Sequence, residues 1–238
     1  MSNLVERLDN RFYPEVSGNW DDSLFRSIIK EELTPKCTVL DLGAGAGIVE
    51  QMNFKGLAAH VCGIDLDERV VENAYLDEGK VAGGEAIPYP DNSFDLIFSD
   101  NVLEHLDHPE AVFLEVARVL KPGGKFFFKT PNKSHYMPLI ARMTPHRFHA
   151  FVNKLRGREV EDTFPTRYRA NSRRCVRKLA EAAGLIVERI ALVEGRPEYL
   201  RIAAPFYLLG IAYERIVNLS DRFSRFRILL IGILRKPA

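Results

Sequence analysis

The sequence predicts an α/β protein built on a doubly wound, largely parallel sheet. Short apolar runs that suit buried strands alternate with segments whose apolar residues repeat with a helical period. A glycine-rich turn follows the first apolar run, as is typical of a strand that leads into a helix. At 238 residues, 46% of them hydrophobic, the chain can bury one large core. We therefore expect a single domain over residues 1–238.

The elements are expected in alternating order after an N-terminal helical cap over residues 1–36, whose main helix is at 22–33. Pro109 suits the first turn of a helix, Asn171 or Ser172 can cap another, and Gly184 can end it. Strands are expected at 37–42, 59–64, 80–82, 94–99, 125–130, 185–193 and 227–234. The helices between them are expected at 48–54, 68–76, 109–120 and 172–183.

The glycine turn has the chemistry of a ligand-binding loop. Gly43, Gly45 and Gly47 have no side chains, so a ligand could lie directly against the main chain, and the helix expected at 48–54 would point its N-terminus at a ligand carboxylate. A dinucleotide fingerprint would require glycine at position 48, where this chain has isoleucine. Glycine turns also join strands to helices for steric reasons alone. Asp65 ends the next apolar run, about twenty residues later, where an acidic side chain would hold a ribose diol.

Four further motifs follow in order: GEAIPYP at 84–90, NSFDLI at 92–97, LEHL at 103–106 and VLKPGG at 119–124. Together with the glycine turn and Asp65, they make residues 37–131 resemble the class I S-adenosylmethionine (SAM) dependent methyltransferases, and among them the ubiquinone- and menaquinone-biosynthesis branch. The resemblance implies a Rossmann-like seven-stranded sheet whose last strand is antiparallel. It also implies an enzyme that converts SAM to S-adenosylhomocysteine.

The resemblance assigns the cofactor contacts residue by residue. The glycines would contact the methionine and ribose parts of SAM, Asp65 the ribose hydroxyls, and Leu66 the adenine. Glu85 and the Ala86 backbone would bind the edge of the adenine. Asp100 and Asn101 would approach the methionine end of the cofactor. Asp41 would orient its neighbours or be a solvated strand end. The expected cofactor-binding residues are Asp41, Gly43, Ala44, Gly45, Gly47, Asp65, Leu66, Glu85, Ala86, Asp100 and Asn101.

A general base is expected if the acceptor is a hydroxyl, which must lose a proton during methyl transfer. His105 follows the fourth strand on the catalytic side, and His135 and Tyr136 are rival candidates. In the quinone branch, Glu104 and His105 match a pair associated with a metal ion, but the acid that precedes them in that pattern is Asn101 here. We therefore expect no metal. Glu104 and His105 could instead brace their loop by hydrogen bonding.

Two insertions exceed the minimal fold. The first, after the fifth strand at 132–170, is basic: residues 132–178 hold twelve Lys or Arg and three acids, against an overall net charge of +1. Such asymmetry predicts an anionic small-molecule, glycan or lipid-like acceptor under a substrate lid, with contacts from Arg147, Arg167, Tyr168 and Arg169. A solvated surface is the alternative. Nucleic acid is not expected, because no nucleic-acid fold is recognisable.

The second insertion, at 195–224 between the sixth and seventh strands, is apolar and aromatic. Residues 202–213 are nearly all hydrophobic, Pro205 suits the start of a helix, and arginines follow. The run is too short to span a bilayer. Residues 202–227 would suit peripheral membrane contact or the wall of a lipid-binding site. Ordinary packing and a subunit interface are the alternatives, and the oligomeric state stays open.

The three cysteines, Cys37, Cys62 and Cys175, have neither metal-ligand nor disulfide spacing. With no signal-peptide pattern, we expect a cytoplasmic protein. The favoured function is O-methylation of a hydroxyl on an anionic or amphiphilic acceptor. N- or C-methylation on the same fold and SAM binding without turnover remain as alternatives.

Overall fold

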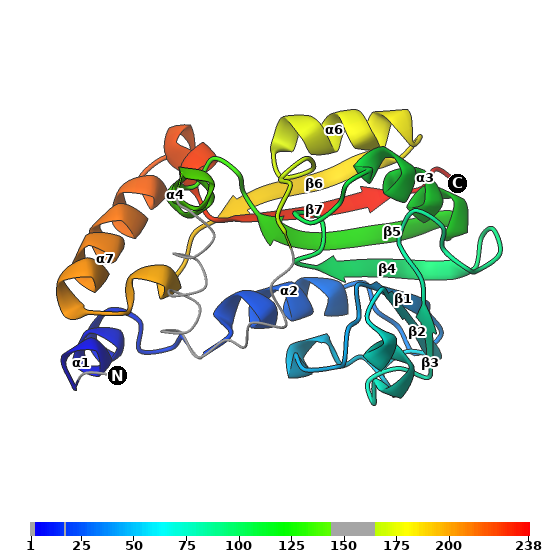
Figure 1. Ribbon diagram of the computed structural model, residues 1–238, viewed down its shortest axis with the longest axis horizontal. Coiled ribbons are helices and arrows are strands. Elements are labelled where there is room, and N and C mark those ends of the chain that lie inside the picture. The colour runs from blue at the N-terminus through cyan, green and yellow to red at the C-terminus, as the bar shows by residue number, and fades with distance from the viewer. Residues whose placement is uncertain (1–2, 17, 144–164) are drawn as a thin grey trace. The chain divides into compact units, whose positions relative to one another are not determined.

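The computed structural model describes residues 3–16, 18–143 and 165–238 (Figure 1). Contacts divide the chain into two compact units. The sheet unit consists of Asp22–Thr130, Thr166–Ala191 and Leu230–Ala238. The second unit consists of Met1–Asp21, Pro131–Pro165 and Leu192–Leu229, and it therefore takes in most of both predicted insertions.

The sheet has seven strands in the order β3-β2-β1-β4-β5-β7-β6. β1 pairs in parallel with β2 and β4, β2 with β3, and β4 with β5. The arrow of β7 points opposite to those of β4 and β6 in Figure 1, so the last strand is antiparallel. The predicted fold class is confirmed. The strands are β1 Thr38–Leu42, β2 His60–Asp65, β3 Glu78–Val81, β4 Phe94–Asp100, β5 Leu120–Pro131, β6 Ile186–Val193 and β7 Leu229–Arg235.

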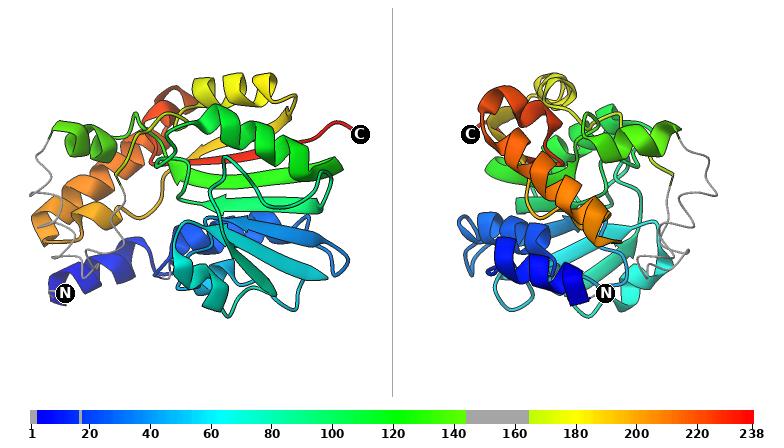
Figure 2. Two further views of the ribbon diagram at one scale, coloured as in Figure 1. Left: turned by 45° about the vertical axis from the view of Figure 1, so that its right-hand side comes forward. Right: turned by 90° about the vertical axis from the view of Figure 1, so that its left-hand side faces the viewer.

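Three helices of the sheet unit follow their predicted positions: α2 Trp20–Lys30, α3 Pro109–Val119 and α6 Arg173–Ala182. α3 has Pro109 in its first turn and buries Val112, Phe113, Val116 and Val119 at helical spacing. The Ser172 hydroxyl caps α6 by accepting from the Cys175 amide, and Gly184 follows the helix with φ of +70°. α3 and α6 contact each other, and they lie side by side along the sheet in Figure 2.

The predicted helices at 48–54 and 68–76 are wrong. These segments contain only short 3-10 turns, η1 Glu50–Met52 and η2 Glu68–Glu72. Extended residues bound both turns, Val49 and Asn53 for η1 and Asp67 and Asn73 for η2. One turn of helix fixes several residues for few hydrogen bonds, and β-branched valines add little helix propensity. A second difference is that β5 begins at Leu120 and not at 125, so it includes the KPGG residues at 121–124.

The second unit contains α1 Asn3–Phe12, α4 Tyr136–Met143, η4 Glu198–Leu200, α7 Ala204–Asn218 and η5 Asp221–Phe226. Pro205 lies in the first turn of α7, as predicted. The core of this unit joins α1 to α7 through Val5, Tyr13, Ala204, Tyr207 and Ile211. Across the described residues, no helix has the length and apolar character needed to cross a bilayer.

Candidate cofactor site

A cavity of about 180 Å³ lies at the carboxyl ends of β1 and β4, where ligands bind in open α/β sheets. Its wall combines the glycine turn with two acidic strand ends and several apolar side chains. The lining residues are Asp41, Gly43, Ala44, Gly45, Ala46, Gly47, Ile48, Val49, Met52, Asn73, Tyr75 and Asp100. Six of the predicted cofactor residues, Asp41, Gly43, Ala44, Gly45, Gly47 and Asp100, therefore meet in one cavity.

Three glycines give the turn its path. Gly43, Gly45 and Gly47 have φ of +89°, +49° and +72°, a region that side chains rarely adopt. The Gly43 and Ala44 amides donate to the Ile64 carbonyl at 2.9 and 3.1 Å, which ties the turn to β2. The turn thus has no side chain larger than a methyl group along the cavity between Gly43 and Gly47.

Asp65 supports the turn from the end of β2. Its Oδ2 accepts from the Gly45 amide at 2.8 Å, and its Oδ1 accepts from the Asp67 amide at 2.9 Å. Each carboxylate oxygen has two lone pairs, so both can accept a further hydrogen bond from a ligand hydroxyl. Asp65 could therefore hold the turn and a ribose diol together.

The acidic strand ends depend on a buried cation. Asp41 is 7% exposed, and burial, with the nearby Asp100 and Asp65 charges, raises its pKa well above the usual range. Lys129, on β5, is fully buried and forms ion pairs with Asp22 and, at 3.0 Å, with Asp100 Oδ1. Lys129 therefore fixes the Asp100 carboxylate, which lines the cavity.

The other predicted cofactor residues do not line the cavity. Leu66 is 73% exposed, and Glu85 and Ala86 are exposed as well. The Ala86 amide already donates to the Gly83 carbonyl at 3.2 Å, so it is engaged in a turn. Asn101 follows β4 with φ of +54°, and its amide donates to the Lys129 carbonyl at 2.9 Å. Their contacts with adenine or methionine stay predictions.

Asn73, which no sequence pattern singles out, holds the glycine turn in place. Its side-chain amide donates to the Ala44 and Gly45 carbonyls at 3.1 and 3.2 Å, and its Oδ1 accepts from the Tyr75 amide at 2.9 Å. Asn73 is only 6% exposed. A buried asparagine needs hydrogen-bond partners, and these contacts supply them; the sequence contains no signal for them, because the burial of Asn73 follows from the fold.

Glu104 and His105 lie after β4, in the sheet unit. Glu104 is 5% exposed, and burial raises its pKa to about 7. Its Oε2 accepts from the Thr130 hydroxyl at 2.7 Å, and Thr130 accepts from the Asn171 amide at 2.6 Å. His105 Nε2 lies 4.0 Å from Glu104 Oε1, with 30% of the His105 side chain exposed. The contacts support the bracing role for Glu104 and leave His105 within reach of solvent.

His135 and Tyr136 belong to the second unit. The His135 side chain is 1% exposed, its ring centre lies 4.1 Å from that of Tyr136, and burial lowers its pKa to about 3. Burial also raises the pKa of Tyr136. Within this unit, the His135 ring is therefore a neutral group in an aromatic cluster that includes Tyr213.

The predicted acceptor contacts form a short loop in the sheet unit. The Arg167 and Tyr168 amides donate to the Glu104 carbonyl at 2.6 and 3.1 Å. The Arg167 guanidinium pairs with Asp107 at 2.9 Å, and Arg169 donates to the Asp107 carbonyl at 2.7 Å. The fourth predicted contact, Arg147, lies outside the described residues.

The fold, the cavity at the β1 and β4 ends, and the carboxylate beside the glycine turn are features expected of a SAM-binding domain of the class I type. A family model described as a methyltransferase domain matches residues 40–128. Over residues 40–128 the chain is therefore similar to class I SAM-dependent methyltransferases, and its relatives include quinone-biosynthesis enzymes.

Three relatives define the range of similarity. The ubiquinone biosynthesis O-methyltransferase of Thiobacillus denitrificans is 36% identical over 43% of this chain and 48% of its own. The glycine/sarcosine/dimethylglycine N-methyltransferase of Actinopolyspora halophila is 34% identical over 48% of this chain and 23% of its own. The chain thus spans about half of these relatives or less. A geranyl diphosphate C-methyltransferase from Streptomyces coelicolor, solved with Mg2+, geranyl diphosphate and S-adenosylhomocysteine, shares the fold at a TM-score of 0.57 and 16% identity, covering 90% of this chain and 79% of that one.

Replacing Asp65 with alanine is expected to weaken SAM binding at least ~10-fold, because a hydrogen bond to a charged group contributes about 1.5–3 kcal/mol. Isothermal titration with SAM measures the effect. Asp67→Ala is the matched control, because Asp67 is two residues away and its carboxylate accepts hydrogen bonds from Arg69. Equal affinities for the two variants, with both folds intact by circular dichroism, would remove Asp65 from the cofactor site.

Proposed function

We propose that the protein transfers the methyl group of SAM to a small anionic or amphiphilic acceptor, most readily to a hydroxyl. The observation that carries the proposal is the cavity in which a glycine-rich turn and two acidic strand ends form one wall. SAM supplies an activated methyl group on a cationic sulfonium, so the protein must mainly bind, align the acceptor and exclude water. Asp100 lines the cavity as a carboxylate paired with Lys129 and would favour the positive charges of the cofactor.

The relatives support the reaction class without fixing the acceptor atom. By their names, the two curated relatives methylate oxygen and nitrogen, and the solved C-methyltransferase methylates carbon. We favour oxygen because His105 follows β4, is 30% exposed, and could accept the proton that a hydroxyl loses. A nitrogen acceptor, deprotonated before transfer, would need such a base less.

The test is the release of S-adenosylhomocysteine when the purified protein is given SAM and fractionated metabolite extract. Turnover with one fraction, followed by identification of the methylated product, would establish the enzyme and its acceptor atom. Tight SAM binding without product in any fraction would favour the alternative, a SAM-binding protein without turnover.

The proposed anionic character of the acceptor rests on the loop at 167–169. The Arg167–Asp107 ion pair is about half exposed on both sides, so it contributes little stability and can exchange for another anion. Arginine pairs with carboxylate or phosphate in a two-pronged geometry. The loop is tied by two backbone hydrogen bonds to Glu104, the neighbour of His105. An acceptor anion held there would lie close to the proposed base.

The double variant Arg167→Gln/Arg169→Gln is therefore expected to raise the acceptor KM at least ~10-fold for each true contact, since such contacts contribute about 1.5–3 kcal/mol. SAM affinity should stay unchanged. Steady-state kinetics with the identified acceptor measure both. Arg173→Gln/Arg174→Gln is the control, because it removes the same charge from exposed positions on α6. If both double variants behave alike, the arginines are a solvated surface.

An amphiphilic acceptor is supported by the exposed apolar side chains of the second unit. Ile202, Phe206, Leu208 and Leu209 are each about half exposed or more. Peripheral membrane contact through residues 202–227 is a related proposal, because Arg215, Arg222 and Arg225 follow these apolar residues in the sequence. Sedimentation with anionic and neutral vesicles distinguishes membrane contact from binding of an amphiphilic acceptor. Membrane contact predicts that the protein sediments with anionic vesicles, whereas binding of a lipid-like acceptor alone does not.

A further inference from the structure

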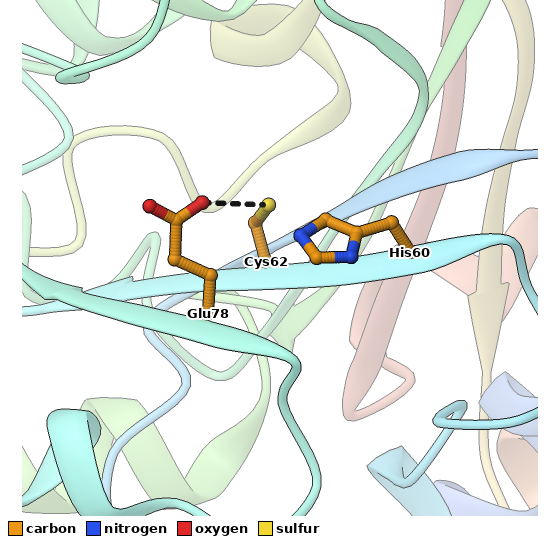
Figure 3. Close-up of side chains that lie close together, drawn as sticks. All are labelled: His60, Cys62 and Glu78. Carbon is orange, nitrogen blue, oxygen red and sulfur yellow. Dashed lines mark hydrogen bonds between the residues drawn. The ribbon is translucent and has the colours of Figure 1, made fainter.

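A cluster of three possible metal ligands lies on the edge of the sheet. His60 and Cys62 are two residues apart on β2, so their side chains share one face, and Cys62 pairs in register with Glu78 on the edge strand β3. One donor atom from each lies within 4.8 Å of the others. Figure 3 shows the three side chains rising from the two strands toward one another.

We propose that His60, Cys62 and Glu78 bind a single zinc ion. Imidazole nitrogen, cysteine sulfur and carboxylate oxygen are the three donor types that zinc uses in proteins, and the thiolate disfavours magnesium and calcium. Three protein ligands would leave one tetrahedral position for water. Spacing along the sequence could not predict this group, because its ligands come from two strands that are neighbours only in the sheet.

The distances require little rearrangement. Bond lengths of about 2.3 Å to sulfur and 2.1 Å to oxygen place two tetrahedral ligands roughly 3.6 Å apart. Cys62 Sγ and Glu78 Oε2 are already 3.7 Å apart. Because His60 is exposed, its ring can close the remaining gap without disturbing the core.

A carboxylate lies near the imidazole of His60. His60 Nδ1 lies 3.8 Å from Asp77 Oδ2, which also accepts from the Val61 amide at 2.9 Å. In Figure 3 the other ring nitrogen points toward the sulfur of Cys62. Metal-bound histidines commonly donate their second nitrogen to a carboxylate, which fixes the tautomer and the direction of the ring. Asp77 is placed to do this for His60.

Two features of the cluster would weaken zinc binding, but neither prevents it. Lys80 Nζ pairs with Glu78 Oε1 at 2.9 Å, but the oxygen near Cys62 is Oε2, so one carboxylate can serve both cations. Burial raises the pKa of the Cys62 thiol. Binding would break the S–H bond, form the Zn–S bond and release one proton to solvent, so the affinity should rise with pH. The groups around the thiol are Glu78, Lys80, Tyr89 and His60.

The site is separate from the proposed cofactor cavity. His60 and Cys62 are in the first half of β2, and Asp65, next to the glycine turn, ends the same strand. A metal there would join the edge strand β3 to β2, and its expected effect is stabilisation. The inference does not depend on methyl transfer.

The test uses the purified, metal-stripped full chain. Zinc is titrated against a chromogenic chelator, and Co2+ replaces zinc so that a thiolate-to-cobalt absorption band reports the sulfur ligand. We expect one zinc per chain, a cobalt band and a higher Tm with zinc. Cys62→Ser should abolish the band and weaken zinc binding at least ~100-fold, and Cys37→Ser, another thiol substitution on a half-exposed residue, should do neither.

His60→Gln keeps the test decisive if Cys62→Ser fails to fold, because His60 is exposed and its loss leaves the core intact. It should weaken zinc binding at least ~10-fold and shift the cobalt band. Absence of a cobalt band in the native chain, or a band unchanged in both variants, would overturn the proposal. The trio would then be a hydrogen-bonded edge cluster without a metal.

Discussion

Gly47→Ala is expected to destabilise the protein by about 2–5 kcal/mol and to weaken SAM binding at least ~10-fold. The left-handed backbone at φ of +72° costs a side chain roughly 1–2 kcal/mol. A methyl group there would also lie 2.3 Å from Asn73 Oδ1, and overpacking costs about 1–3 kcal/mol. Asn73 cannot retreat freely, because it holds the Ala44 and Gly45 carbonyls and the Tyr75 amide. Moving it would deform the wall of the cavity.

Gly56→Ala is the matched control. Gly56 has a similar φ of +79°, but a methyl group there would meet nothing within 4 Å. Its cost should be the backbone strain alone, with SAM affinity unchanged. Chemical denaturation gives the stability of both variants, and calorimetry gives their SAM affinity. If the two alanine variants lose the same stability and bind SAM equally, Asn73 does not clamp the turn.

The comparison extends to Gly45. A methyl group at Gly45 would lie 3.9 Å from Asp65 Oδ2 and would meet no other atom within 4 Å, so the space is open. The strain at φ of +49° remains, and a branched side chain would fill the cofactor's approach. Gly45→Val should therefore reduce SAM affinity more than stability, whereas Gly47→Ala reduces both.

The predictable part of the site is the part that lies close together in sequence or repeats a known pattern. The glycine turn follows the first strand and Asp65 ends the next, and this spacing along the sequence indicates a shared site. Parallel β1 and β2 then bring the Gly45 amide onto the Asp65 carboxylate. Periodicity likewise predicted α3 and α6, whose buried faces have a regular helical spacing.

The parts that could not be predicted depend on contacts between distant residues. Buried Lys129 pairs with Asp22 and Asp100, which lie 107 and 29 positions away in the sequence. A lysine within an apolar strand gives no indication of which residues will be its partners. The contacts of Asn73 and of the pair Cys62–Glu78 could not be predicted for the same reason, because the folded chain and its strand register decide which side chains meet. The helices predicted at 48–54 and 68–76 do not form, although their sequences have helical periodicity. Over seven to nine residues, this periodicity does not overcome the cost of helix nucleation.

Lys129→Met is expected to destabilise the protein by about 3–5 kcal/mol, because removing one partner of a buried ion pair leaves charge without compensation. Methionine nearly matches lysine in length, so the loss would come from the charge and not from a cavity. Both carboxylates that lose their cation, Asp22 and Asp100, are largely buried, at 14% and 11% exposure of their side chains. Asp100 lines the cavity, so SAM affinity should fall as well.

Lys125→Met separates burial from charge on the same strand. Lys125 lies four residues before Lys129, on the same face of β5, and it too pairs with two carboxylates, Glu32 at 2.8 Å and Glu188 at 3.0 Å. Its side chain is 22% exposed, and Glu32 is 47% exposed, so solvent screens the pair and its loss should cost only about 1 kcal/mol. Urea denaturation of both variants measures the difference. Equal losses would mean that burial adds nothing to the Lys129 pair. An unchanged SAM affinity in Lys129→Met would mean that Asp100 needs no cation to keep its place in the cavity wall.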